Sequence, residues 1–139
     1  MRLVLNDPLA EVRVTLSAEG GSCARARQVV RDAASSWGLS EDLADDAQLV
    51  VTELVSNGID HGEGLITLTV SRRPGGMLVE VRDESAKQPQ LRPVDPNSAR
   101  GRGMQLVQAL SARWGTTPDG RGKVVWAELE GGERVPDPV

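Results

Sequence analysis

The pattern of apolar and polar positions predicts a strand and a helix in the first quarter of the chain. Residues 11–17, "EVRVTLS", alternate apolar and polar side chains at the period of a strand. Residues 22–37 then carry apolar side chains every three or four positions, the period of a helix. Ser22 is its predicted N-cap and Gly38 its end.

A second amphipathic helix is predicted after Ser40, which is a suitable N-cap followed by two acidic residues in the first turn. Its apolar stripe consists of Leu43, Ala47, Val50, Val51, Leu54 and Val55. Glu53 and Asn57 fall at the margin of this stripe, one turn apart and on the same face. We therefore expect both polar side chains to border the core.

Residues 65–83 predict a hairpin, because two alternating segments flank the turn sequence "RRPGG". In the second strand Val79, Val81 and Asp83 share one face. A carboxylate on an apolar face is unfavourable by several kcal/mol unless it is paired, hydrogen-bonded or solvated in a pocket. Asp83 thus requires a partner, which is either an internal donor or a ligand.

The remaining segments complete an α+β pattern. Residues 84–100 hold three prolines and no clear period, which is typical of a lid or a disordered segment. Gly101 and Gly103 precede a predicted helical stripe formed by Leu106, Val107, Leu110 and Trp114, and "KVVWAEL" predicts a last strand. The order favours two layers, with helices on one face of a mixed, mostly antiparallel sheet.

Composition limits the classes of function. The 139 residues fit one domain, predicted at 1–130 with a loose tail at 131–139. A formal net charge of -4 and a pI of about 5.0 argue against a nucleic-acid partner. The single cysteine, Cys23, cannot form an internal disulfide, and the N-terminal residues lack the long apolar run of a membrane span. We expect a cytoplasmic protein that binds no membrane.

Three motifs in this order resemble the GHKL superfamily of ATP-binding domains, which share the Bergerat fold of histidine kinases and DNA gyrase. "ELVSN" resembles the Glu-x-x-x-Asn helix box, "VEVRD" the strand that ends on an adenine-binding Asp, and "GRGMQLV" the second glycine box. The resemblance covers nearly the whole chain. Within the superfamily, the chain is most similar to small bacterial anti-sigma-factor serine/threonine kinases.

The resemblance implies a role for each motif residue. Glu53 would act as general base toward an attacking hydroxyl, and Asn57 would supply an amide oxygen to Mg²⁺. Asp83 would accept a hydrogen bond from the exocyclic amino group of adenine. ATP and Mg²⁺ are therefore the expected ligands.

The glycines and two basic residues are further candidates for nucleotide binding. Gly101 and Gly103 would bring backbone N–H groups to the phosphates. Arg102 lies between them and could contact the triphosphate, although a solvated side chain is the default for an arginine. His61 follows the helix box and either lines the pocket or interacts with the helix C-terminus.

Two positions depart from the family pattern. The first glycine box usually runs Asp-x-Gly-x-Gly, whereas Asp83 is followed by "ESAK", with Ser85 at the first glycine position. The last strand often carries a Thr that supports the adenine-binding Asp, and the aligned residue here is Val124. Loss of one hydrogen bond to a charged group corresponds to about 1.5–3 kcal/mol, which predicts weaker ATP binding.

The leading functional hypothesis is an ATP-dependent serine/threonine kinase that binds a sigma factor and phosphorylates a small anti-sigma antagonist protein. The alternative is a non-catalytic module of the same fold, in which ATP orders residues 84–100 and so selects a protein partner. A detached histidine-kinase catalytic domain is a poorer third hypothesis, because few residues precede Ser22. The resemblance is also compatible with a homodimer formed through an exposed sheet or the N-terminal edge.

Overall fold

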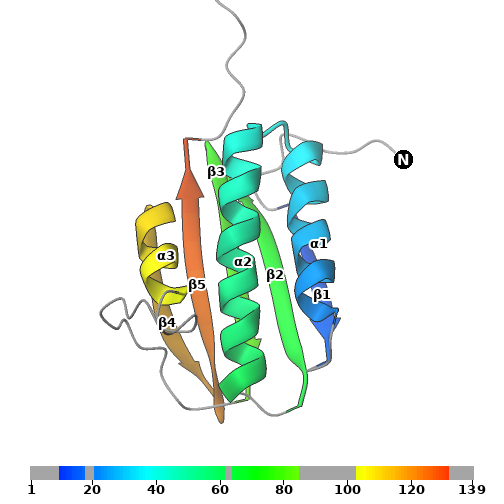
Figure 1. The fold of residues 1–139 in the computed structure, drawn as a ribbon, viewed down its shortest axis with the longest axis vertical. Helices are drawn as coiled ribbons and strands as arrows, with labels where there is room; N and C mark the ends of the chain where they lie inside the picture. Colours follow the sequence, from blue (N-terminus) through cyan, green and yellow to red (C-terminus); the bar gives the residue numbers. More distant parts are fainter. Residues whose placement is uncertain (1–9, 18–20, 62–63, 85–102, 132–139) are drawn as a thin grey trace, which may run out of the picture.

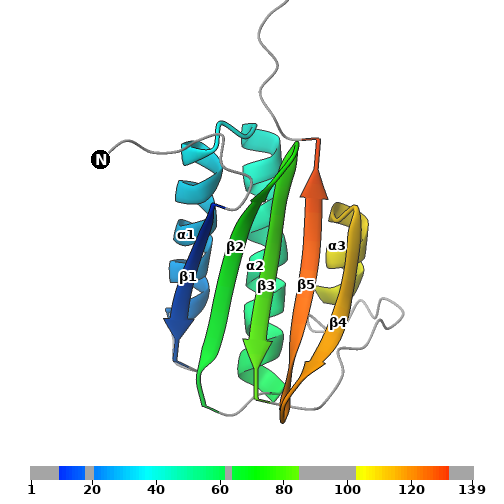
Figure 2. The ribbon, with the colours of Figure 1, turned by 180° about the vertical axis from the view of Figure 1, so that it is seen from behind.

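A computed structural model describes residues 10–17, 21–61, 64–84 and 103–131. Within these residues, three helices pack on one face of a five-stranded sheet (Figure 1). The opposite face of the sheet carries no described helix (Figure 2). The α+β class and the two-layer arrangement predicted from the sequence are confirmed.

The described elements follow one another as β1 (Glu11–Leu16), α1 (Ser22–Ser36), α2 (Glu41–His61), β2 (Ile66–Arg73), β3 (Gly76–Asp83), α3 (Gly103–Leu110), β4 (Arg113–Asp119) and β5 (Gly122–Glu130). The strand order is β1-β2-β3-β5-β4, and every neighbouring pair is antiparallel. The predicted hairpin is formed by β2 and β3. Strand β5 lies on the other side of β3, so β3 is the centre of the sheet.

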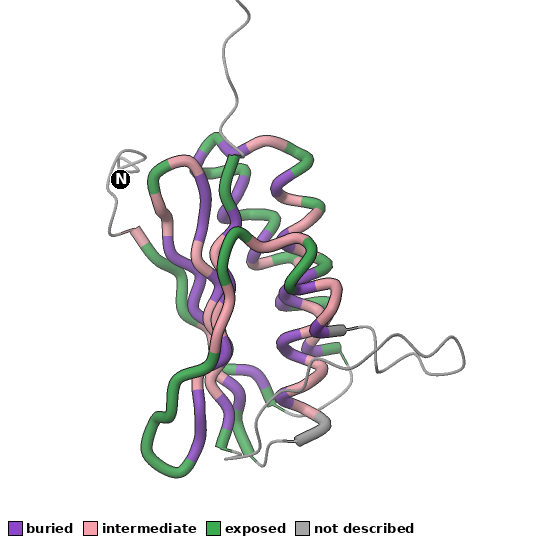
Figure 3. The backbone as a smooth tube through the Cα atoms, turned by 90° about the vertical axis from the view of Figure 1, so that its left-hand side faces the viewer, coloured by how far each residue is buried: buried purple, intermediate pink, exposed green. Residues whose placement is uncertain are grey.

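The core lies between the sheet and the helices, where buried residues of both layers face each other (Figure 3). Its largest fully buried side chains are Leu54, Ile66, Leu68 and Met77, together with valines of α1, α2, α3, β2 and β3. Alternate positions of the two central strands supply the floor of this core, namely Met77, Val79 and Val81 of β3 and Val125, Ala127 and Leu129 of β5. No described helix is long and apolar enough to cross a membrane.

The third helix is shorter than predicted, and it is followed by a strand, β4, that the sequence pattern did not predict. Helix α3 ends at Leu110, whereas Trp114 lies in β4 and packs against the core from there. Trp114 continues the spacing of the preceding apolar stripe, which explains the wrong prediction. Pro118 is compatible with this strand because β4 lies at the edge of the sheet, where the missing N–H of a proline is tolerated.

Trp126 lies outside the core, although a large aromatic side chain in a predicted strand would be expected there. Its neighbours in β5, Val125 and Ala127, are buried against the helices, so Trp126 faces the other side of the sheet. There its ring covers Gly115 of β4, where an added Cβ would lie 2.8 Å from Cζ2 of Trp126. Trp37, in contrast, belongs to the core.

The two long helices begin differently. Ser40 caps α2 as predicted, because the backbone N–H of Leu43 donates a hydrogen bond to its Oγ at 3.1 Å. Ser22 is not the N-cap of α1: Gly21 occupies that position with a φ of 98°. The hydroxyl of Ser22 donates instead to the carbonyl of Ser17, which connects the start of α1 to the end of β1.

Candidate functional site

The C-terminal half of α2 presents the first two predicted site residues. Glu53 and Asn57 are half-buried and lie one helical turn apart. Burial raises the pKa of the Glu53 carboxyl above its ordinary value, because partial removal from water disfavours the charged form. A carboxylate with a raised pKa is a stronger proton acceptor, which suits a general base.

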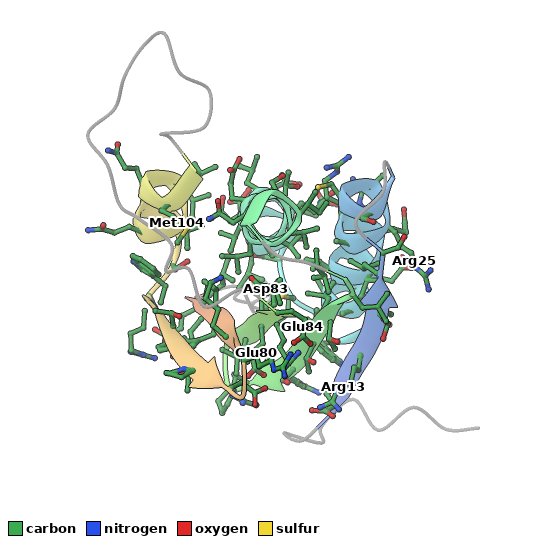
Figure 4. All side chains as sticks on the ribbon, turned by 90° about the horizontal axis from the view of Figure 1, so that it is seen from below. Arg13, Arg25, Glu80, Asp83, Glu84 and Met104 are labelled. Atoms are coloured by element: carbon green, nitrogen blue, oxygen red, sulfur yellow. The ribbon has the colours of Figure 1, made fainter. Side chains whose placement is uncertain are left out.

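Asn57 connects α2 to the first turn of α3. Its Nδ2 donates a hydrogen bond to Sδ of Met104 at 3.1 Å, and Met104 is buried. Figure 4 shows Met104 on α3, the helix next to α2. The hydrogen bond is made by Nδ2, so it restricts rotation of the amide group and does not use Oδ1.

Asp83 ends β3 on the face of the sheet that α2 covers, and its side chain lies between α2 and the sheet (Figure 4). The residue is only 2% exposed. Gly58 of α2 is a neighbour of this side chain, because an added Cβ at Gly58 would lie 3.7 Å from Oδ2 of Asp83. Since Gly58 directly follows Asn57, Asp83 lies next to the segment of α2 that carries Asn57, and Glu53 precedes Asn57 by one helical turn.

Lys123 is the site residue that the sequence-based reasoning missed. It lies opposite Asp83 in the register of β3 and β5, and its Nζ is 3.0 Å from Oδ1 and 3.1 Å from Oδ2 of Asp83. Both side chains are buried. The signal was available, because Lys123 has the same parity as Val125 and Ala127, which face the core.

Val124 is not the position that supports Asp83, so the sequence-based alignment of the last strand is corrected by one residue. Val124 pairs with Arg82 and lies on the opposite face of the sheet. A shift of one residue along a strand exchanges its two faces. The side chain next to the carboxylate is therefore the ammonium of Lys123, rather than a residue without a donor.

The other predicted site residues are only partly covered by the structure. Gly101, Arg102 and most of the predicted lid lie outside the described residues, as does the tail after Gly131. Gly103 is the first residue of α3 and precedes Met104. His61 is the last residue of α2, and its side chain lies outside the described structure. Their proposed roles stay predictions.

A cavity of about 440 Å³ lies at the other end of α2. It is lined by Arg31, Ser35, Gly38, Leu39, Ser40, Glu41, Ala44, Asp45 and Gln48. These residues come from the end of α1, the connection and the first turns of α2. The cavity is therefore separate from the predicted site, which lies at the C-terminal end of the helix.

Comparison with known families assigns the fold. Residues 16–129 match the model of the histidine kinase-like ATPase domain. The chain belongs to this family. Membership in a family of ATPase domains implies that the chain binds ATP, and it confirms the GHKL resemblance of the motifs.

A solved structure has a similar fold. It contains the RsbU and RsbW domains of Rv1364c from Mycobacterium tuberculosis and aligns with a TM-score of 0.65 at 14% sequence identity. The alignment covers 90% of this chain and 33% of that one, so the chain spans about a third of the length of the solved protein. No curated protein sequence matches.

The described residues fit the phosphate end of a magnesium-bound nucleotide better than its base end. Glu53 and the oriented amide of Asn57 have the chemistry that the phosphate end requires. The base end contains the expected carboxylate, but both oxygens of Asp83 already accept hydrogen bonds from Lys123. The described residues therefore include the side chains expected at the phosphate end, whereas the carboxylate expected at the base end is paired with an internal cation.

Proposed function

We propose that this chain is an ATP-dependent serine/threonine kinase of the anti-sigma-factor type, which phosphorylates a small antagonist protein and binds a sigma factor. The observation that carries the proposal is that Asn57, one turn after Glu53 on α2, directly precedes Gly58, which lies against Asp83 of β3. The motif resemblance to anti-sigma-factor kinases supports the choice of partners. Similarity in fold to a chain with an RsbW domain agrees with it.

In the proposed mechanism Glu53 acts on the hydroxyl of the antagonist. Its carboxylate accepts the hydroxyl proton while the hydroxyl oxygen bonds to the γ-phosphorus and ADP leaves with the bridging oxygen. Asn57 would hold Mg²⁺ through Oδ1, and the ion would supply neutralisation of the charge on the phosphates. The hydrogen bond from Asn57 to Met104 is made by Nδ2, so it does not use that oxygen.

Transfer of labelled phosphate from ATP to a purified antagonist tests the proposal. We expect labelling by the wild type and a decrease of about 10²- to 10⁴-fold in Glu53→Gln, the range for loss of a general base. Glu80→Gln is the matched control, because Glu80 lies on the other face of β3 (Figure 4). A wild type that binds ATP but labels no antagonist, or a Glu53→Gln variant that labels at the normal rate, would contradict the assignment.

A second candidate function is a non-catalytic module whose partner affinity depends on ATP. It is favoured by the contact between Asn57 and Met104, because α3 starts directly after residues 85–102. Binding of Mg²⁺ at Oδ1 of Asn57 would then affect the first turn of α3. A protein partner that binds at α3 would respond to this change. Sigma-factor affinity of Glu53→Gln, measured with and without Mg-ATP, tests this candidate, and an unchanged affinity would exclude it.

Light scattering of the same samples tests the expected homodimer.

A further inference from the structure

The buried ion pair of Asp83 and Lys123 lies at the end of the site where the nucleobase is expected. Two neighbouring central strands hold it, β3 through Asp83 and β5 through Lys123. The side chains are 3% and 4% exposed, respectively. Helix α2 covers the pair at Gly58, whose added Cβ would lie 3.7 Å from Oδ2 of Asp83.

This arrangement restricts the access of any ligand to the carboxylate. The ammonium of Lys123 donates to both Oδ1 and Oδ2, at 3.0 and 3.1 Å. With so little of Asp83 exposed, an amino group from outside reaches these oxygens only if a neighbouring side chain moves. Lys123 has a long, flexible side chain, whereas Asp83 is attached by a single methylene group and Gly58 has no side chain to move.

We propose that Lys123 determines the nucleotide affinity of the site by competing with the amino group of the nucleobase for Asp83. The inference rests on the proposed nucleotide-binding function. A hydrogen bond between two ionised groups is stronger than one from a neutral amino group, so the internal donor holds the carboxylate against the ligand. Base binding then requires Lys123 to leave at least one oxygen of Asp83.

The proposal predicts that removal of Lys123 raises the affinity for ATP, whereas simple electrostatics predicts that it lowers this affinity. ATP is a polyanion, and removal of a nearby positive charge should weaken its binding if charge alone decided the affinity. Removal of the competitor should instead strengthen binding of the base. A purely structural ion pair predicts no gain of affinity at all.

The primary experiment is calorimetric titration of Mg-ATP into wild type and Lys123→Thr. Threonine suits a strand, and its hydroxyl can donate to the remaining carboxylate. We expect Lys123→Thr to bind ATP about tenfold more tightly or better, the factor that corresponds to one hydrogen bond to a charged group. Arg113→Thr is the matched control: it also removes one positive charge from the sheet, but on exposed β4, and should not gain affinity.

Inorganic tripolyphosphate locates the effect within the site. It carries the phosphate chemistry without a base, so its affinity should not increase in Lys123→Thr. Equal gains for tripolyphosphate and ATP would place the effect at the phosphate end and overturn the proposal. Circular dichroism and urea unfolding of each variant confirm that the titrated protein is folded.

A second measurement uses the wild-type side chain and does not depend on the stability of the Lys123 variant. The chain contains only two lysines, Lys87 and Lys123, so Lys87→Arg leaves a single lysine for isotope labelling. We expect the NMR signal of the Lys123 side chain to shift on addition of Mg-ATP and to stay in place with tripolyphosphate. An unchanged signal in protein saturated with ATP would overturn the proposal.

The outcomes separate this inference from the proposed function. If wild type binds ATP while Lys123→Thr binds it equally or more weakly, competition by Lys123 is wrong and the nucleotide site stands. If both folded proteins fail to bind ATP, the nucleotide site and the competition are both wrong. Binding that is detectable only in Lys123→Thr supports the competition most directly.

Discussion

Gly58 lies against the carboxylate of Asp83, with only 3.7 Å between Oδ2 and the position that a Cβ of Gly58 would occupy. The same Cβ would be 3.2 Å from Cδ1 of Ile66. The absence of a side chain at Gly58 thus lets α2 approach the sheet at the point where the helix and the strand bring their polar residues together.

This contact predicts how much volume the position tolerates. Gly58→Ala should change the free energy of unfolding by less than about 1 kcal/mol, because the helix propensity gained offsets a contact that the flexible end of Ile66 can relieve. Gly58→Val should destabilise by about 1–3 kcal/mol through overpacking. Urea unfolding measures both. Ala44→Val in the same helix is the control, and equal losses in the two valine variants would contradict the steric account.

The ion pair predicts a strong coupling in stability. Asp83→Asn and Lys123→Met should each destabilise by about 3–5 kcal/mol, since each removes one partner of a buried pair. The double variant replaces the pair by uncharged groups and should be less destabilised than the sum of the single variants. A double-mutant cycle of urea unfolding measures the difference. If the losses in free energy of unfolding were strictly additive, the side chains of Asp83 and Lys123 would not stabilise each other.

The raised pKa of Glu53 predicts a pH dependence of stability. The folded protein binds the Glu53 proton more tightly than the unfolded chain does, whose carboxyl has an ordinary pKa of 4.5. Glu53 therefore contributes stability below about pH 4.5 that is lost as the pH rises through the higher pKa of the folded state. The stability of wild type relative to Glu53→Gln should fall over this range in urea titrations. A difference that rises with pH has the wrong sign, and Glu41→Gln is the control on the same helix.

The N-cap of α2 predicts a simple local effect. Ser40→Ala removes the acceptor for the backbone N–H of Leu43 and should lower the free energy of unfolding by about 0.5–2 kcal/mol. Ser36→Ala, at the exposed last residue of α1, should change it much less. Thermal unfolding at one pH compares the two variants. Equal effects would indicate that the hydroxyl of Ser40 does not act as a cap.

The fold followed from the sequence wherever the period of the apolar residues was clear. The stripe of α2 placed Glu53 and Asn57 at its margin, and the alternation along β3 placed Asp83 on the buried face. The pattern failed at Trp114, where the apolar spacing of α3 runs on into an edge strand. Periodicity alone cannot locate the end of a helix when the next strand begins with an apolar residue in phase.

The error at the base end of the site had a different origin. Alignment to a family pattern selected Val124, although the alternation of β5 placed Lys123 on the buried face. A lysine is rarely buried unless it is paired, so alternation along a strand is weak evidence that Lys123 faces the core. Only the register of β3 and β5 shows that the buried cation and the buried anion are opposite each other, because sequence alone does not specify which strands pair.

The hydrogen bond between Asn57 and Met104 provides the chain with an intrinsic spectroscopic probe. A cation at Oδ1 withdraws electrons from the amide and makes its Nδ2 protons more acidic, so the environment of the Met104 methyl group changes when the site is filled. Met77, fully buried at the start of β3, provides a reference signal in the same protein. Methyl-labelled methionine thereby makes occupancy of the site visible without any change to the sequence.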